Sequence, residues 1–448
     1  MKHSIPVPHA AFSNEPVRYD IKLRRVRLFL AACLLFSLPE AAFSYSVLTH
    51  ELLIDLTWKQ QLEPLLLKRF PGTTAAELQR AQSYAYGGCV IQDLGYYPFA
   101  HEFFSNLTHY VRSGDFVTNL LRDARTVDEY AFALGALSHY IGDNIGHHDA
   151  INLATAISFP GLERKYGPVV TYDQNAHAHI RTELAFDIDQ LSHHRLAPGA
   201  YLRFIGFRVP TRVLAQAFRE TYSLSLRSVI GQRRPAIRSY RTSVRSFLPR
   251  IAHAESVLHG GDFPPDVDDA QFQLFLEHIA QADFQKDWNR YRRKPGVMTH
   301  LMAVLIYILP KIGPLSELAI KIPTPATQDL YVKSVNRTIA LYSSRIEQLA
   351  TGDATGSLPN RDLDTGEETR PGAYARTDQT YAQLLHTLVA NPSRPLARGV
   401  KEHLLDYYSA PNAPIRTKRD RKAWARVQSG LVILRNMPVT ASPRDARL

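Results

Sequence analysis

The chain has 448 residues, of which 45% are hydrophobic and 21% are charged. This balance is that of a globular protein with a large core, and it excludes a chain too polar to fold. The formal net charge of +11 favours anionic partners such as phosphate-rich substrates, but net charge describes association rather than chemistry.

The first 44 residues are expected to form a secretory signal peptide. Basic residues from Lys22 to Arg27 precede the apolar run LFLAACLLFSL and the small-residue stretch PEAAFS. This order is typical of a signal, and the run is shorter than the about 20 residues of a membrane anchor. We therefore expect cleavage before Tyr45 and export to the periplasm or out of the cell. Lipoprotein-type cleavage at Cys33 is the alternative.

Most of the remaining chain shows helical periodicity. Apolar residues recur at three- and four-residue spacing in four early stretches, 48–67, 77–86, 117–145 and 178–191. Further helical stretches follow after about Pro235, and alternating strand patterns are scarce. The sequence therefore predicts an all-α fold, a multi-helix bundle. The apolar run LMAVLIYIL is too short to cross a membrane and is interpreted as a buried helix.

Residues 351–375 are rich in Gly, Thr, Asp and Pro and have no periodicity, so we predict a loop or linker there. A last helical pair is expected at about 376–434. Its basic run IRTKRDRKAWAR is interpreted as a solvated face, with contact to nucleic acid or anionic lipid as the alternative. The predicted parts are a signal peptide, a main helical domain, a linker and a helical C-terminal extension, at 1–44, 45–350, 351–375 and 376–448.

The stretch LGALSHYIGDNIGHH contains His139, Asp143 and His147 at successive four-residue steps. Positions four apart lie on one face of a helix, so the three side chains form one polar stripe on an otherwise apolar helix. Two ligands on a helix reach the same metal ion when they are three or four residues apart. The spacing therefore indicates a metal site.

A second histidine–acid pair, His179 and Glu183, has the same spacing in HAHIRTELAFD. Either pair alone is more often a set of hydrogen-bonded side chains, because 18 histidines make such pairs common. Both pairs together, with the further histidine one turn below the first, favour a site for zinc or a related metal.

The motifs THELL, GGCVIQDLGYY, SNLTHYVRSGD, GALSHYIGDNIGHH and AHIRTE occur in this order. From about Tyr45 to Asp189, the chain resembles the zinc-dependent phospholipase C family, which is related to the S1/P1-type nucleases. The resemblance implies a helical bundle with up to three zinc ions in a cleft, followed here by a helical C-terminal extension.

The resemblance also implies which residues hold the ions. Asp143 would bridge, and the mature N-terminal amine and carbonyl would act as ligands. The implied sets are Tyr45 with His50, Asp93 with His109 and His139, and His147 with His179 and Glu183.

Two departures from the family pattern, and one rival histidine, bear on this assignment. The mature N-terminal residue is Trp in the best-known members and Tyr45 here, which makes correct signal cleavage essential. The last ligand after the bridging aspartate comes early, so His148 is an alternative to His147, although only His147 shares the helix face of the stripe. His101 is a rival of His109.

The resemblance implies a secreted phosphodiester hydrolase of the phospholipase C type. It would cleave phospholipids at a membrane surface into diacylglycerol and a phosphorylated head group, using a metal-activated water that Asp93 holds or deprotonates. A single-strand nuclease of the S1/P1 type, with nucleic acid as its partner, is one alternative. A non-catalytic zinc-stabilised protein that binds lipid or the cell envelope is another.

Overall fold

A computed structural model describes residues 47–196, 206–259, 261–266, 268–282, 297–308, 319–352, 357–409 and 421–440. By their contacts, all of the described residues belong to one compact unit. The predicted signal peptide and Tyr45 lie outside the described residues.

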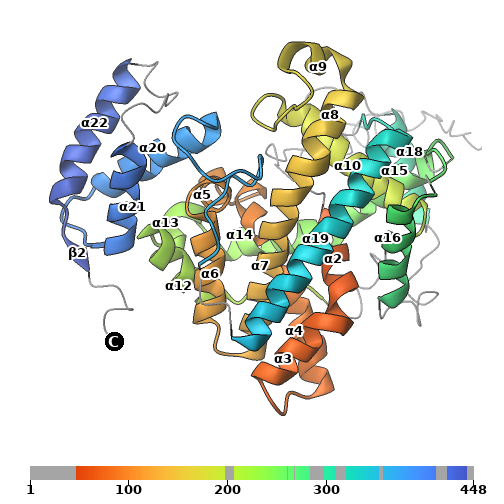
Figure 1. The fold of residues 1–448 in the computed structure, drawn as a ribbon, viewed down its shortest axis with the longest axis horizontal. Helices are drawn as coiled ribbons and strands as arrows, with labels where there is room; N and C mark the ends of the chain where they lie inside the picture. Colours follow the sequence, from red (N-terminus) through yellow and green to blue (C-terminus); the bar gives the residue numbers. More distant parts are fainter. Residues whose placement is uncertain are drawn as a thin grey trace, which may run out of the picture. The chain divides into compact units, whose positions relative to one another are not determined.

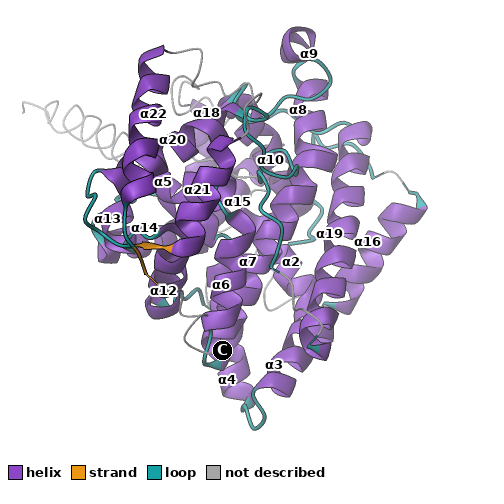
Figure 2. Cartoon of the chain, turned by 60° about the vertical axis from the view of Figure 1, so that its left-hand side comes forward, coloured by secondary structure: helices purple, strands orange, loops and turns teal. Residues whose placement is uncertain are grey.

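The described part of the chain is built from helices, which confirms the predicted all-α fold (Figure 2). The helices up to residue 192 are α2 Val47–Thr57, η1 Trp58–Leu62, α3 Glu63–Arg69, α4 Ala75–Gly88, η2 Ile91–Tyr96, α5 Glu102–Tyr110, α6 Ser113–Asp123, α7 Val127–Gly146, η3 His147–Ile151, α8 Asn152–Ser158, α9 Pro160–Tyr166 and α10 Ala176–Ser192.

The later helices are α12 Thr211–Tyr222, α13 Leu226–Ile230, α14 Arg233–Thr242, η4 Ser243–Phe247, α15 Leu248–His259, α16 Ala270–Gln281, α18 Val297–Ile308, α19 Pro325–Thr351, α20 Ala375–Val389, α21 Arg398–Ser409 and α22 Arg421–Asn436. Two short strands, β1 Leu396–Ala397 and β2 Val439–Thr440, pair in parallel. The prediction of a last helical pair at about 376–434 is therefore wrong, because three helices, α20, α21 and α22, occupy that region.

The predicted helical stretch at 117–145 is also divided, into α6 and α7. The division occurs because Thr126 takes an extended conformation and its hydroxyl accepts a hydrogen bond from the Glu129 amide at 3.2 Å. A threonine in this position caps a new helix instead of continuing the old one. The periodicity of apolar residues continues across the break and therefore hides it.

Helix α7 forms the centre of the core, and almost all of its residues are buried. It packs against α2, α4, α6 and α19, and Figure 1 shows α19 running alongside it. The Tyr342 hydroxyl of α19 donates to the Leu134 carbonyl of α7 at 2.8 Å. This burial on all sides places the polar stripe of α7 in the interior.

Helices α4 and α7 approach each other through glycines. A Cβ atom added at Gly135 would lie 2.1 Å from the Ala85 carbonyl oxygen, and one added at Gly88 would lie 2.1 Å from the Phe132 carbonyl oxygen. Both clashes are with backbone, which cannot move aside as a flexible side chain can. The spacing of these two helices therefore requires glycine.

The segment predicted as a linker packs against the helices where it is described. The Leu363 amide donates to the His109 carbonyl at 3.1 Å, and the Ser113 hydroxyl donates to the Arg361 carbonyl at 2.6 Å. At Gly366, φ is +72°, and an added Cβ would lie 2.4 Å from the Asn144 carbonyl oxygen. Residues 357–374 are thus a docked loop; the domain boundaries stay a prediction.

Helix α18 contains most of the apolar run that we interpreted as a buried helix. Ala303 and Ile306 are buried, whereas Leu301, Val304 and Tyr307 have exposed fractions of 58%, 57% and 77%. The interpretation is therefore correct for one face only. Within the described ranges, no helix combines the length and apolar content that crossing a bilayer requires.

We predict that Gly135→Ala lowers the free energy of unfolding by about 2 to 3 kcal/mol, since the added methyl group overpacks the contact with α4. Gly161→Ala is the matched control, because it lies on exposed helix α9 and its added Cβ would have only the Arg164 side chain, at 3.9 Å, as a neighbour. Urea denaturation measures both. Equal stability of Gly135→Ala and the unmodified protein would contradict the close approach.

Candidate metal centre

Three groups of buried histidine and acidic side chains lie in the bundle interior, each with its ligand atoms within 4.8 Å of one another. They contain every residue of the sequence-predicted set except Tyr45, and His139 belongs to two of them. The groups are His50, His139 and Asp143; Asp93, His109 and His139; and His147, His179 and Glu183.

Six helical elements bring these side chains together. Helix α2 contributes His50, η2 Asp93, α5 His109, α7 both His139 and Asp143, η3 His147, and α10 both His179 and Glu183. The α7 helix widens into the π-helical turn η3 at the site, a local change that often accompanies functional residues. Such a turn changes the direction of the side chains that follow the α-helical stripe.

Asp187 ties α2 to α10. Its carboxylate accepts hydrogen bonds from the Leu48 amide at 2.8 Å and the Thr49 amide at 3.0 Å. These amides begin α2 and have no partner within the helix, so the carboxylate stabilises the helix start. The contact fixes His50 relative to His179 and Glu183.

Asp143 is the common neighbour of three imidazoles. Its carboxylate oxygens lie 3.2 Å from His50 Nε2, 3.0 Å from His139 Nε2 and 3.4 Å from His109 Nε2. Asp93 Oδ1 lies 3.3 Å from His109 Nε2 and 3.9 Å from His139 Nε2. These two carboxylates therefore surround the same pair of histidines.

The third group centres on Glu183. Its Oε1 atom lies 2.7 Å from His179 Nδ1 and 3.6 Å from His147 Nε2. The other nitrogen of His179 lies 2.9 Å from Asn152 Oδ1, while Asn152 Nδ2 donates to the Asp364 carbonyl at 2.9 Å. That carbonyl fixes the orientation of the amide, so His179 Nε2 must donate, and Nδ1 presents a lone pair to Glu183.

Backbone carbonyls fix the protonation of three further imidazoles. The Nδ1 atoms of His109, His139 and His147 lie 2.8, 3.0 and 2.7 Å from the carbonyl oxygens of Ser105, Cys89 and Leu363. A carbonyl oxygen only accepts hydrogen bonds, so each Nδ1 carries a proton. In the neutral ring, Nε2 then presents its lone pair to the facing carboxylate.

This donor set fits a divalent metal ion. Lone pairs on nitrogen face carboxylate oxygens, and two acceptors attract each other only through a shared proton or a cation. Within the described part of the chain, both Asp93 oxygens, Glu183 Oε2, and the Nε2 atoms of His139 and His147 make no hydrogen bond although they are buried. Imidazole nitrogen with carboxylate oxygen is a typical donor set for zinc.

The pKa values of the site residues reflect this crowding. Burial lowers the pKa of His109, but the neighbouring carboxylates of Asp143 and Asp93 outweigh burial and raise it to about 10. Burial raises the pKa of Asp143, but the neighbouring histidines bring it well below its usual value. Burial, Asp143 and Asp93 all raise the pKa of Glu183. The carboxylates thus depend on nearby positive charge.

The structure separates the alternative histidines from the groups. The His147 side chain is 3% exposed and faces Glu183, whereas the His148 side chain is 53% exposed and lies 2.7 Å from Asp149. His101 Nδ1 accepts a hydrogen bond from the Phe103 amide and so caps α5. The geometry therefore favours His147 and His109, while the assignment of all these residues as ligands stays a prediction.

The sequence analysis missed Asp364 and Arg376, which approach the site from the C-terminal part of the chain. The Asp364 carboxylate accepts hydrogen bonds from the hydroxyls of Tyr110 at 2.9 Å and Tyr374 at 2.7 Å. Its Oδ1 atom lies 3.9 Å from His147 Nδ1. No spacing signal could have found these residues, because Asp364 lies within a stretch without periodicity and Arg376 directly follows it.

Arg376 lies between aromatic rings beside the groups. Its guanidinium carbon is 5.0 Å from the ring centre of Tyr172, which is itself 5.8 Å from the His179 ring. Among the described residues, the guanidinium donates one hydrogen bond, to Asn106 Oδ1 at 3.3 Å, and its buried Nε makes none. A half-buried cation with unused donors is suited to an anionic ligand.

Residues 49–231 match the family model described as zinc dependent phospholipase C. The match includes every described member of the three groups and covers less than half of the chain, so Asp364 and Arg376 lie beyond it. No curated protein and no solved structure matches the chain. The resemblance predicted from the sequence motifs is confirmed over the matched residues.

We predict that His147→Ala removes zinc from the protein and that His148→Ala does not. The first change deletes a buried nitrogen of the third group, whereas the second removes a side chain that points to solvent. Elemental analysis of the purified variants gives the zinc content. A zinc-poor His148→Ala beside a zinc-replete His147→Ala would move the predicted ligand by one residue.

Proposed function

We propose that this protein is an exported zinc-dependent phosphodiester hydrolase of the phospholipase C type. The observation that supports the proposal is the convergence of the three histidine and carboxylate groups inside the segment similar to that family. We propose up to three zinc ions, held by these groups, and phospholipid head groups at a membrane surface as the substrate.

Zinc ions at such a site would polarise phosphoryl oxygens and lower the pKa of water toward about 7. The residues of this chain would supply orientation and proton transfer. Both Asp93 oxygens make no hydrogen bond within the described residues, so one oxygen is available to orient the attacking water and accept its proton. Asp143 would stay negatively charged, and its carboxylate would lie between the first two groups of side chains.

We propose that Tyr45, through its amine and carbonyl, completes the first group. Two features support this role: Asp187 holds the amides of Leu48 and Thr49, and His50 lies 3.2 Å from Asp143. The chain just after Tyr45 is thereby anchored beside the buried groups. Signal cleavage at this residue is then needed for full metal content.

Arg376 is proposed to hold the substrate phosphate. Its guanidinium lies over the Tyr172 ring, beside the third group, with unused hydrogen-bond donors. A guanidinium presents paired donors that match two phosphate oxygens. This role would give the C-terminal part of the chain a direct function in the site.

The decisive test uses the mature chain beginning at Tyr45, loaded with zinc and assayed in parallel on phosphatidylcholine and on single-stranded nucleic acid. We expect release of diacylglycerol, and we expect Asp93→Asn to lower kcat by about 100-fold or more. Hydrolysis of nucleic acid alone would indicate a nuclease. Zinc binding without hydrolysis of either substrate would indicate a non-catalytic protein.

Arg376→Met should raise KM by about 10- to 100-fold with unchanged zinc content, because charge-assisted hydrogen bonds to phosphate are lost. Inhibition by inorganic phosphate should weaken in parallel, and Arg376→Lys should restore part of the affinity. Arg370→Met, at an exposed position of the docked loop that precedes α20, is the control. An unchanged KM together with unchanged phosphate inhibition would rule out this role.

A further inference from the structure

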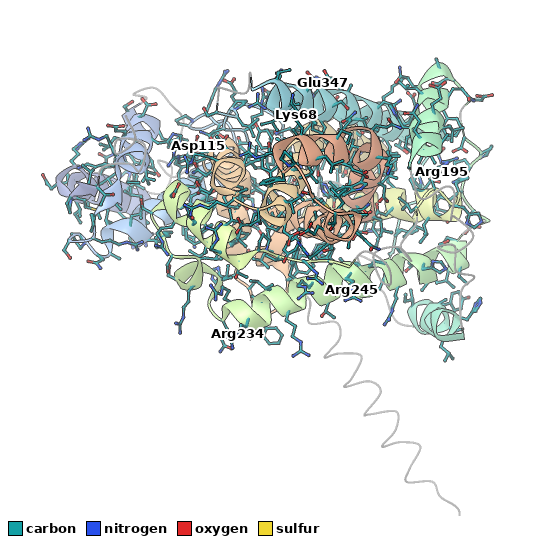
Figure 3. The ribbon with its side chains drawn as sticks, turned by 90° about the horizontal axis from the view of Figure 1, so that it is seen from below. Lys68, Asp115, Arg195, Arg234, Arg245 and Glu347 are labelled. Carbon is teal, nitrogen blue, oxygen red and sulfur yellow. The ribbon has the colours of Figure 1, made fainter. Side chains whose placement is uncertain are left out.

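One stretch of the surface contains only positive charge. From residue 221 to residue 254 the chain has seven arginines and no lysine or acidic residue. All of these arginines are exposed, and they lie on α13, α14, η4 and α15. We call this set the arginine face: Arg227, Arg233, Arg234, Arg238, Arg241, Arg245 and Arg250. Figure 3 shows the side chains of Arg234 and Arg245 on this helical stretch.

The charges of the arginine face are close together. The pKa of Arg241 is lowered by burial and by the neighbouring guanidinium groups of Arg245 and Arg208. Arg208 is exposed as well and extends the positive surface. Within the described residues, Arg227, Arg234 and Arg238 make no ion pair. Like charges held together on a surface attract anionic partners strongly.

An exposed apolar stripe lies next to the arginine face. Helix α18 packs against α15, which carries Arg250. Leu301, Val304 and Tyr307 follow one another at three-residue steps along α18, and all three are more than half exposed. The apolar stripe and one end of the arginine face therefore belong to two helices that pack together.

We propose that the arginine face and the apolar stripe of α18 together form a docking surface for a bilayer that contains anionic phospholipid. Arginines attract anionic head groups, and apolar residues with a tyrosine gain free energy at the boundary of head groups and acyl chains. Nucleic acid would use the charge but would leave Leu301 and Val304 in water. Docking needs neither metal nor turnover, so it is independent of the proposed chemistry.

The test measures sedimentation of the mature zinc-loaded chain, beginning at Tyr45, with vesicles of phosphatidylcholine, with and without phosphatidylglycerol. We expect binding only to the anionic vesicles. The combined change of Arg227, Arg234 and Arg238 to Gln should weaken binding by about 100-fold, since each charge near an anionic surface contributes about fivefold. The same change of Arg421, Arg426 and Arg435 on α22 removes equal charge and should have little effect.

The apolar stripe is tested at high salt, where surface charges are screened. Leu301→Gln with Val304→Gln should abolish the binding that remains, whereas Val432→Gln, at a 57% exposed position on α22, should not. Thermal melting verifies that each variant folds. Equal binding to both vesicle types, or equal losses in the two arginine variants, would overturn the proposal. Binding of single-stranded oligonucleotides, but not vesicles, would assign the face to nucleic acid.

Discussion

The burial of ionisable groups is the constraint on which this structure depends. Asp93, Asp143 and Glu183 lie in the interior of a helical bundle, where a carboxylate without compensating charge costs several kcal/mol. Five imidazoles surround them, and backbone carbonyls hold three of these rings so that their lone pairs point inward. Helix packing alone would not hold these carboxylate oxygens and imidazole lone pairs together, because hydrogen-bond acceptors repel one another. Positive charge between the side chains turns this repulsion into attraction, which links folding to the binding of cations.

The scaffold meets this constraint by placing backbone close to backbone. Helix α4 leads into η2 and Asp93, while α7 carries His139 and Asp143, so the glycine contact between α4 and α7 sets the distance between these side chains. The hydrogen bonds of Asp187 likewise set the position of α2 relative to α10. The ligand atoms thus owe their positions to contacts outside the metal groups, and loss of one such contact would change several distances at once.

Sequence patterns predicted those features that are local. The helix period alone placed His139 with Asp143 and His179 with Glu183, because residues four apart share a face. Asp93 and His109 have no such partner nearby in the chain, and only the resemblance to a family indicated them. The docking of the predicted loop and the place of Arg376 beside the site were missed, since the contacts that they make join residues far apart in the chain. The start of a new helix at Thr126 was missed because the spacing of apolar residues continues from α6 into α7.

The hydrogen bond from His147 to the Leu363 carbonyl joins residues separated by 216 positions. A ribosome makes the chain from its N-terminus, so every candidate ligand is synthesised long before the acceptor that orients His147. The loop contacts Asn144 through Gly366, and this loop is synthesised only after α19. The third group therefore acquires its final geometry late in biosynthesis. A gene fragment cut at residue 231 would encode its side chains without the backbone that aligns them.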